Sequence, residues 1–134
     1  MLVDTGILVA AADASDRRSS AAQDVLQANP GRMVVTDAIL SEAHHLISDR
    51  AGRRIAAAFL QSIDFDFFVE PSTRPDRDRA KDLCVEYLDA GLDYTDALTI
   101  AIAERIGEPV IATLDRRHFS IVRPRHIDAF EIVP

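Results

Sequence analysis

Two aspartates directly follow short apolar runs that are typical of β-strands. Asp4 follows the opening residues MLV, and Asp115 follows VIATL. Sites in open parallel sheets form beyond the carboxyl ends of the strands, so both carboxylates are expected at one edge of a sheet. An aspartate at such an edge can be a ligand, or it can have a structural role. The structural role would be the cap of the next helix for Asp4 and a turn residue for Asp115.

Two further acids lie in helical sequence close to that edge. Glu42 is three residues after Ile39 and four before Leu46, so it lies on the apolar stripe of its helix, where an unpaired carboxylate is costly. Asp96 lies in the first turn of an apolar helix, three residues after Asp93. The plainer alternatives are a rim position for Glu42 and a capping pair with Asp93 for Asp96.

Taken together, the four acids favour a metal site. Four carboxylates at one sheet edge repel one another strongly, and a divalent cation with oxygen ligands relieves that repulsion. The sequence has four histidines and one cysteine. With so few nitrogen and thiolate donors, Mg²⁺ or Mn²⁺ is favoured over Zn²⁺ as the cofactor.

The elements that must position these acids follow from hydrophobic periodicity and turn residues. Strands are predicted over residues 1–5, 32–36, 65–70, 109–114 and 130–134. Helices are predicted over residues 15–29, 36–52, 53–63, 76–91 and 93–107, the last being apolar enough to pack on more than one face. Residues 6–13 either continue the first strand or begin a helical turn. Helical segments between strands indicate parallel β-α-β crossovers, so we expect an α/β fold of three layers with a mainly parallel central sheet flanked by helices.

Length and composition bound the class of protein. The 134 residues predict one domain over residues 1–134, and 48% hydrophobic with 28% charged residues fits a soluble globular chain. No apolar run approaches the roughly 18 residues of a membrane span, and no secretory signal pattern precedes the first strand, so a cytoplasmic location is expected. The lone Cys84 lies in an apolar helical pattern and is expected to be buried rather than catalytic.

The net charge of the chain argues against a nucleic-acid partner, but the distribution of its charges weakens that argument. A net charge of −7 is unfavourable for binding phosphates, but leaving out the four acids of the predicted metal site takes it from −7 to −3. Fourteen of the fifteen basic residues are arginines, which occur in clusters and suit phosphate recognition. The alternative for any one cluster is that its arginines lie on a solvated face or take part in capping pairs.

Four segments together carry a family resemblance. In this order and at these separations, MLVDTGILVA, SEAHHL, DYTDALTIAIAERIG and VIATLDRRHF resemble a PIN domain, and the chain length resembles the VapC class of toxin ribonucleases from bacterial toxin–antitoxin pairs. The resemblance covers nearly the whole chain. Two departures bear on the site: Gly6 stands where the family often has Asn or Ser, which leaves Thr5 as the expected hydroxyl, and the last acid of the family varies, which concerns Asp115.

The resemblance implies a Mg²⁺- or Mn²⁺-dependent endoribonuclease that hydrolyses RNA phosphodiester bonds. It assigns the catalytic acidic pocket to Asp4, Glu42, Asp96 and Asp115, with Asp93 as a candidate further acid. On this hypothesis Asp4, Asp96 and Asp115 hold the metal ion. Glu42 holds metal or orients the attacking water.

Residues around the last acid complete the predicted site. Thr113 is two residues before Asp115 and so lies on the same face if the strand persists, where it would position a carboxylate or a phosphate. Arg116, Arg117 and His118 follow Asp115 directly and are the candidates for contacts with RNA phosphates. The plainer role of His118 is to cover the edge of the core.

The resemblance also implies a homodimer and a cognate antitoxin, whose C-terminal segment lies across the toxin and blocks the acidic pocket. An apolar groove for a partner helix would use Phe59, Leu60 and Ile63, unless these residues pack in the core. Two other functions stay open. One is a catalytically inactive PIN-like module that binds proteins. The other is a phospho-acceptor signalling domain, although this chain lacks the late lysine and offers only Asp37 after a middle strand.

Overall fold

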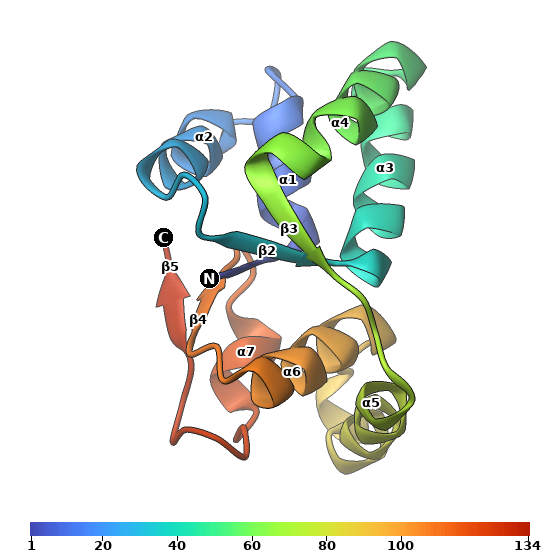
Figure 1. Cartoon of the computed structure of the whole chain (residues 1–134), viewed down its shortest axis with the longest axis vertical. Coiled ribbons are helices and arrows are strands. Elements are labelled where there is room, and N and C mark those ends of the chain that lie inside the picture. Colours follow the sequence, from blue (N-terminus) through green and yellow to red (C-terminus); the bar gives the residue numbers. More distant parts are fainter.

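The computed structural model describes residues 1–134 and is built on one five-stranded sheet (Figure 1). The strands lie in the order β3-β2-β1-β4-β5, and every neighbouring pair is parallel. Parallel neighbours cannot be joined by tight hairpins, so the connections cross over through helical segments. The strands are β1 (Leu2–Val3), β2 (Met33–Thr36), β3 (Phe67–Glu70), β4 (Val110–Ala112) and β5 (Glu131–Val133).

Helices cover both faces of the sheet, with α1 to α4 above it and α5 to α7 below it in Figure 1. The upper layer contains α1 (Thr5–Ala12), α2 (Ser19–Ala28), α3 (Asp37–Ala51) and α4 (Arg53–Asp66). The lower layer contains α5 (Arg74–Glu86), the short 3₁₀ helix η1 (Leu88–Ala90), α6 (Tyr94–Ile106) and α7 (Arg117–Ile121). None of these helices has the length and apolar character to span a membrane. The predicted three-layer α/β fold is confirmed, and the sheet is wholly parallel.

The two faces of the sheet carry separate apolar cores. Each core contains fourteen buried residues, one beside α1 to α4 and the other beside α5 to α7. Successive strand residues point to opposite faces, so Leu2 joins the core beside α6 while Val3 joins the core beside α1. Ile111 and Ala112 divide in the same way. Burial on both faces explains why the central strands read as continuous apolar runs.

Helix α6 packs on more than one face, as its apolar sequence predicts. Every residue from 97 to 103 is buried, between the sheet and α5. Asp93 caps the helix by accepting a hydrogen bond from the Asp96 N–H at 2.9 Å. Gly107 ends it at a φ of 71°, a left-handed conformation that glycine adopts without strain. Both ends are thereby fixed, which sets the position of the first turn.

Three boundaries near the strands differ from the predicted ones by two or more residues. Helix α1 begins at Thr5, so the ambiguous segment 6–13 is largely helical and β1 is only two residues long. Strand β4 ends at Ala112, before the end of the predicted run. Strand β3 begins at Phe67, because Phe65 and Asp66 extend α4. Phe65 is 88% exposed, so its aromatic side chain does not mark a sheet position.

The lower helices also differ from the prediction at their ends. Helix α5 begins at Arg74, because Thr73 forms a capping box with Asp76, and it ends at Glu86 rather than at Gly91. Helix α7 is absent from the predicted elements. Its five residues are too few for a periodic signal, and Phe119 alone among them is buried.

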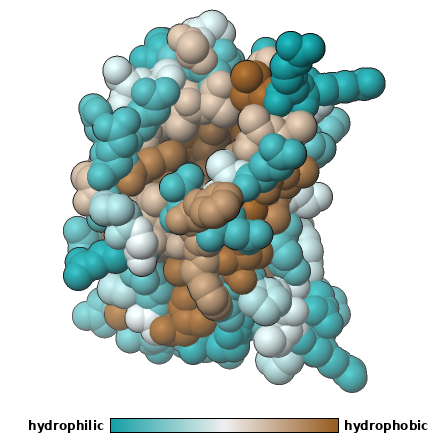
Figure 2. Space-filling view, turned by 45° about the horizontal axis from the view of Figure 1, so that its top comes forward, coloured by the Kyte–Doolittle hydropathy of each residue, from teal (hydrophilic) through white to brown (hydrophobic).

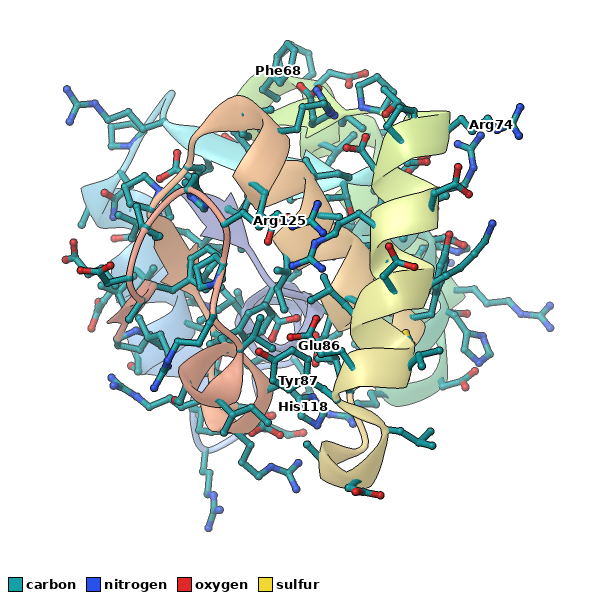
Figure 3. All side chains as sticks on the ribbon, turned by 90° about the horizontal axis from the view of Figure 1, so that it is seen from below. Phe68, Arg74, Glu86, Tyr87, His118 and Arg125 are labelled. Carbon is teal, nitrogen blue, oxygen red and sulfur yellow. The ribbon has the colours of Figure 1, made fainter.

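Charged side chains tie α6 to the elements around it. Arg105 of α6 donates to both carboxylate oxygens of Asp76 of α5, at 2.9 and 3.0 Å. Glu104 accepts two hydrogen bonds from Arg79 of α5, at 2.9 and 3.0 Å, and a third from the backbone N–H of Arg125 at 3.0 Å. Figure 3 shows Arg125 lying across α6. These pairs hold the α5–α6 layer and the C-terminal loop together.

Candidate active site

The strand order reverses between β1 and β4, and the carboxyl ends of these strands open onto a cleft of about 320 Å³. Connections that leave neighbouring strands for opposite faces produce a crevice at such a point. We call this space the acidic cleft. It is lined by Asp4, Thr5, Gly6, Val9, Arg18, Glu42, Leu46, Arg50, Asp93, Asp96, Leu114, Asp115, Arg117 and His118.

Asp4 directly follows β1 and is only 9% exposed. Its backbone N–H donates to the carbonyl of Ala112 at 2.9 Å, which holds it against β4. Asp4 stands at the N-cap position of α1, yet its carboxylate makes no capping hydrogen bond. Its Oδ2 accepts instead from the Thr113 hydroxyl at 2.7 Å. Burial raises the pKa of Asp4, and the hydrogen bond from Thr113 offsets this only in part.

Thr113 links the ends of the two central strands. Its hydroxyl donates to Asp4 and accepts the backbone N–H of Asp115 at 3.0 Å. The side chain is 1% exposed, so its rotamer is fixed by packing as well as by hydrogen bonds. Strand β4 ends just before Thr113, but the Thr113 N–H still donates to the carbonyl of Val133 at 2.8 Å and keeps the sheet direction.

Glu42 and Thr5 join α3 to the start of α1. The Thr5 hydroxyl donates to Glu42 Oε2 at 2.6 Å. The buried stripe of α3 consists of Ile39, Ala43 and Ile47, and Glu42 lies half-buried beside this stripe rather than on it. The carboxylate therefore reaches the acidic cleft with one oxygen already held by a hydroxyl.

Asp96 lies in the first turn of α6 and is bound by His118 of α7, which is labelled in Figure 3. The Nδ1 of His118 is 2.6 Å from Asp96 Oδ2. The pKa of Asp96 is raised to about 7, first by burial and then by the charges of Asp93 and Asp4, against the hydrogen bond from His118. One ligand atom each from Asp93, Asp96 and His118 lies within 4.8 Å of the others, a spacing that a single cation can bridge.

Asp115 lies at the mouth of the acidic cleft and is paired with Arg117. The Arg117 Nε donates to Asp115 Oδ1 at 2.9 Å, and this hydrogen bond lowers the pKa of Asp115 to about 2. Arg116 donates instead to the carbonyl of Pro134 and does not line the cleft. Of the three residues predicted to contact phosphates, Arg117 and His118 therefore border the acids, and Arg116 lies outside.

Two arginines outside the predicted site also line the acidic cleft. Arg18 comes from the loop between α1 and α2, and Arg50 comes from the last turn of α3. The spacing of Arg50 was a usable signal, because Glu42, Leu46 and Arg50 are successive i+4 positions along one side of a helix. Arg18 gave no such signal, since only the folded path of its loop brings it to the cleft.

Family membership is settled by comparison with known proteins. The sequence model of the PIN domain matches residues 1–123. The chain belongs to the PIN domain family. It is 27% identical to Ribonuclease VapC26 of Mycobacterium tuberculosis over 135 residues, covering 100% of both chains. It also resembles the crystal structure of Mycobacterium tuberculosis VapC20, a sarcin–ricin loop cleaving toxin, with a TM-score of 0.79 and 23% identity over 87% of this chain and 91% of that chain. The resemblance to VapC-type PIN ribonucleases is thereby confirmed.

The donor set of this PIN domain fits Mg²⁺ or Mn²⁺. Asp4, Glu42 and Asp96 bring carboxylate oxygens to one cleft, and hard divalent cations prefer such ligands. Burial disfavours the charged forms of Asp4 and Asp96, and a cation between them would offset that cost. Cys84 does not line the cleft and His118 is its single histidine, so the set is poorly suited to Zn²⁺.

We predict that the metal-free PIN domain is more stable at pH 5.5 than at pH 8, by about 2 kcal/mol. The pKa of Asp96 is about 7 in the folded chain against an ordinary value of 3.8, so the folded state holds a proton that the unfolded state has lost. The stability gained from that proton is lost as the pH rises through 7. Urea unfolding in EDTA at both pH values measures the difference. The variant Asp96→Asn should lose most of it, and equal stability of the wild type at both pH values would contradict the prediction.

Proposed function

We propose that this PIN domain is an endoribonuclease, the toxin of a toxin–antitoxin pair, which hydrolyses RNA phosphodiester bonds in the acidic cleft with Mg²⁺ or Mn²⁺. The observation that carries the proposal is the convergence of Asp4, Glu42, Asp96 and Asp115 on one cleft at the switch point of the sheet. These acids come from four separate segments of the chain. The similarity to Ribonuclease VapC26 supports the same class of reaction.

The proposed metal ligands are Asp4, Asp96 and Asp115. Glu42 is either a further ligand or the residue that orients the attacking water, and Asp93 is a candidate fifth acid, being both the cap of α6 and a neighbour of Asp96. A bound divalent ion would supply charge stabilisation at the phosphate and lower the pKa of a water molecule.

The neighbours of these acids have proposed roles of their own. The Thr5 hydroxyl occupies Oε2 of Glu42, which leaves Oε1 free to accept a hydrogen bond from the attacking water. The Thr113 hydroxyl occupies Oδ2 of Asp4 and leaves Oδ1 for a ligand role. Arg117 at the mouth remains a proposed contact for RNA phosphates.

His118 and Arg116 differ in what they offer to RNA. His118 borders the cleft, and its Nδ1 is occupied by Asp96, so a contact with phosphate would use Nε2. Arg116 is engaged with the carbonyl of Pro134 and is a proposed contact only for RNA that extends beyond the cleft.

An apolar groove supports the proposed antitoxin partner. Two adjoining hollows between α1, α2 and α4 share Ala11, Leu26, Asp66 and Phe67. Figure 2 shows an apolar band between hydrophilic borders on the face that carries the upper helices. Of the three groove residues predicted, Phe59 lines a hollow, Leu60 is 41% exposed outside it, and Ile63 is buried in the core. We propose that an amphipathic antitoxin helix binds in this groove. We also propose that the protein forms a homodimer and that it is located in the cytoplasm.

The phospho-acceptor alternative has little support. Lys81, the only lysine of the chain, pairs with Asp78 on the exposed side of α5 at 2.9 Å and does not line the acidic cleft. The inactive protein-binding module is the remaining alternative, and a cleavage assay separates it from the nuclease.

The test is incubation of a total RNA pool with the purified, antitoxin-free protein. We expect discrete fragments in Mg²⁺ or Mn²⁺ and none in EDTA, and the fragment ends identify the substrate. Asp4→Asn prepared in parallel controls for contaminating nucleases. A folded wild-type protein that binds Mn²⁺ and cuts nothing would reject the nuclease and leave the protein-binding module.

A further inference from the structure

One wall of the acidic cleft is formed by a row of side chains along α3. Glu42, Leu46 and Arg50 all line the cleft and follow one another at intervals of four residues. Eight residues of α-helix span about 12 Å, so Arg50 stands well away from the acids at the carboxyl ends of the strands. The wall thus begins at an acid of the proposed catalytic site and ends at an exposed cation.

Arg50 differs from the other two arginines of the cleft in having no ion pair. Arg117 is paired with Asp115, and the Nε of Arg18 lies 3.3 Å from Asp16. Arg50 makes neither a salt bridge nor a side-chain hydrogen bond within the chain. Two acids of the loop after α1 interact electrostatically with Arg50, and both already have hydrogen-bond donors. Asp13 accepts from the Ser15 hydroxyl at 2.6 Å, and Asp16 accepts from the N–H of Arg18 at 2.8 Å.

An RNA strand entering this cleft meets a difficulty that a free cation would relieve. Five acids line the cleft, and a bound metal ion would neutralise only those that hold it. The phosphates on either side of the cut bond still approach a negatively charged wall, and an unpaired guanidinium that borders this wall offers them a two-pronged hydrogen-bond donor.

We propose that Arg50 binds a phosphate of the RNA strand other than the one that is cut, and so aligns the strand along α3 across the acidic cleft. The inference rests on the proposed ribonuclease function and names a substrate-positioning residue for it. Arg50 is far enough along the helix to act on binding rather than on bond breaking. Its loss should raise KM and leave kcat nearly unchanged.

The test measures RNA affinity against salt concentration. Arg50→Gln is compared with Arg54→Gln, which removes the same charge from an exposed position that does not line the cleft. Both are placed on an Asp96→Asn background, so that bound single-stranded RNA stays intact during fluorescence anisotropy. Because each phosphate contact to a single strand contributes about 0.7 to the slope of log K against log salt, Arg50→Gln should reduce that slope by about 0.7 and Arg54→Gln should leave it unchanged.

Cleavage by the otherwise wild-type enzyme gives a second readout. Arg50→Gln should raise KM roughly tenfold at low salt with kcat within about twofold, and Arg50→Lys should recover part of the affinity because it keeps the charge. Equal slopes and equal KM values for Arg50→Gln and Arg54→Gln, in a protein that cleaves RNA, would overturn this inference alone. A loss of kcat at unchanged KM would overturn it as well. A wild type that neither binds nor cuts RNA would reject the proposed function, and this inference with it.

Discussion

An asparagine in place of Asp96 is expected to reduce RNA cleavage by about 100-fold or more, since even supporting residues around a metal cost about 10- to 100-fold when they are changed. The amide preserves the shape of the side chain but removes a charge from the proposed metal site. Initial rates of fragment formation in Mn²⁺, at equal protein concentration, measure the effect.

The fold should survive this substitution. Burial raises the pKa of Asp96, so its charge is unfavourable in the metal-free chain at pH 8, and the neutral amide removes that cost. The matched control is Asp64→Asn, on the exposed side of α4 and outside the acidic cleft, which should cleave RNA like the wild type. Cleavage by Asp96→Asn at the wild-type rate would remove Asp96 from the site.

A companion variant separates the two roles of Asp93. Asparagine is as good an N-cap as aspartate, so Asp93→Asn keeps the cap of α6 while it removes the charge. A loss of activity without a loss of stability in this variant would assign Asp93 to the metal site. Unchanged activity would leave it as the helix cap alone.

Replacing Arg105 by methionine is expected to lower the free energy of unfolding by about 3–5 kcal/mol, because it leaves the buried carboxylate of Asp76 without its cationic partner and with only the hydrogen bonds from Thr73. Asp76 is 3% exposed, and Arg105 holds both of its oxygens. Arg105 also donates to Glu70 at 2.8 Å and to the Pro71 carbonyl at 3.2 Å, so the substitution unties α6 from the segment that joins β3 to α5. Urea unfolding at pH 7 measures the loss.

Two further variants test that explanation. Arg74→Met removes an exposed arginine from the pair with Asp78 and should change stability by less than about 0.5 kcal/mol. The double variant Asp76→Asn/Arg105→Met removes the buried charge together with its partner and should regain much of the stability lost by Arg105→Met alone. A loss no greater than that of Arg74→Met would show that the buried pair contributes little.

The contribution of this pair also has a defined pH dependence. Burial opposes the charging of Asp76, but hydrogen bonds from Arg105 and Thr73 outweigh it and hold the pKa of Asp76 below its ordinary value. The stability that the charged pair gives is therefore present at neutral pH and is lost as the pH falls through the lowered pKa. This is opposite in sign to the effect of Asp96, whose raised pKa weakens the metal-free fold as the pH rises.

The sequence predicted the architecture well where local and tertiary signals agree. Long apolar periods located α3 and α6, and apolar runs placed all five strands. The failures have physical causes. Exposed Phe65 mimicked a strand residue, and α7 is too short to show a helical period. Strand β1 is held in the sheet although it has only two residues, because it pairs with β2 on one side and with β4 on the other.

The site was predictable where an acid follows a strand and less so where the fold brings segments together. Asp4, Glu42, Asp96 and Asp115 line one cleft. The contact between His118 and Asp96 was not foreseen, because it depends on α7 turning back toward α6. Arg116 and Arg117 are adjacent in sequence, yet the first turns to the C-terminus and the second to the cleft. Adjacent positions on a short helix point in different directions, and only the folded chain decides which one meets the acids.

The acidic cleft joins parts of the chain that differ in how firmly they are held. Asp4 is anchored by β1, whose two residues are fully buried at the centre of the sheet, so it moves only when the whole domain unfolds. Arg117 and His118 belong to α7, a single short turn with one buried side chain. Local opening of α7 is therefore expected to need less free energy than opening of the central strands. The cleft thus has a firmly held floor at Asp4 and a less firmly held rim, and opening of that rim would release Asp96 and Asp115 from the side chains that hold them in the metal-free chain.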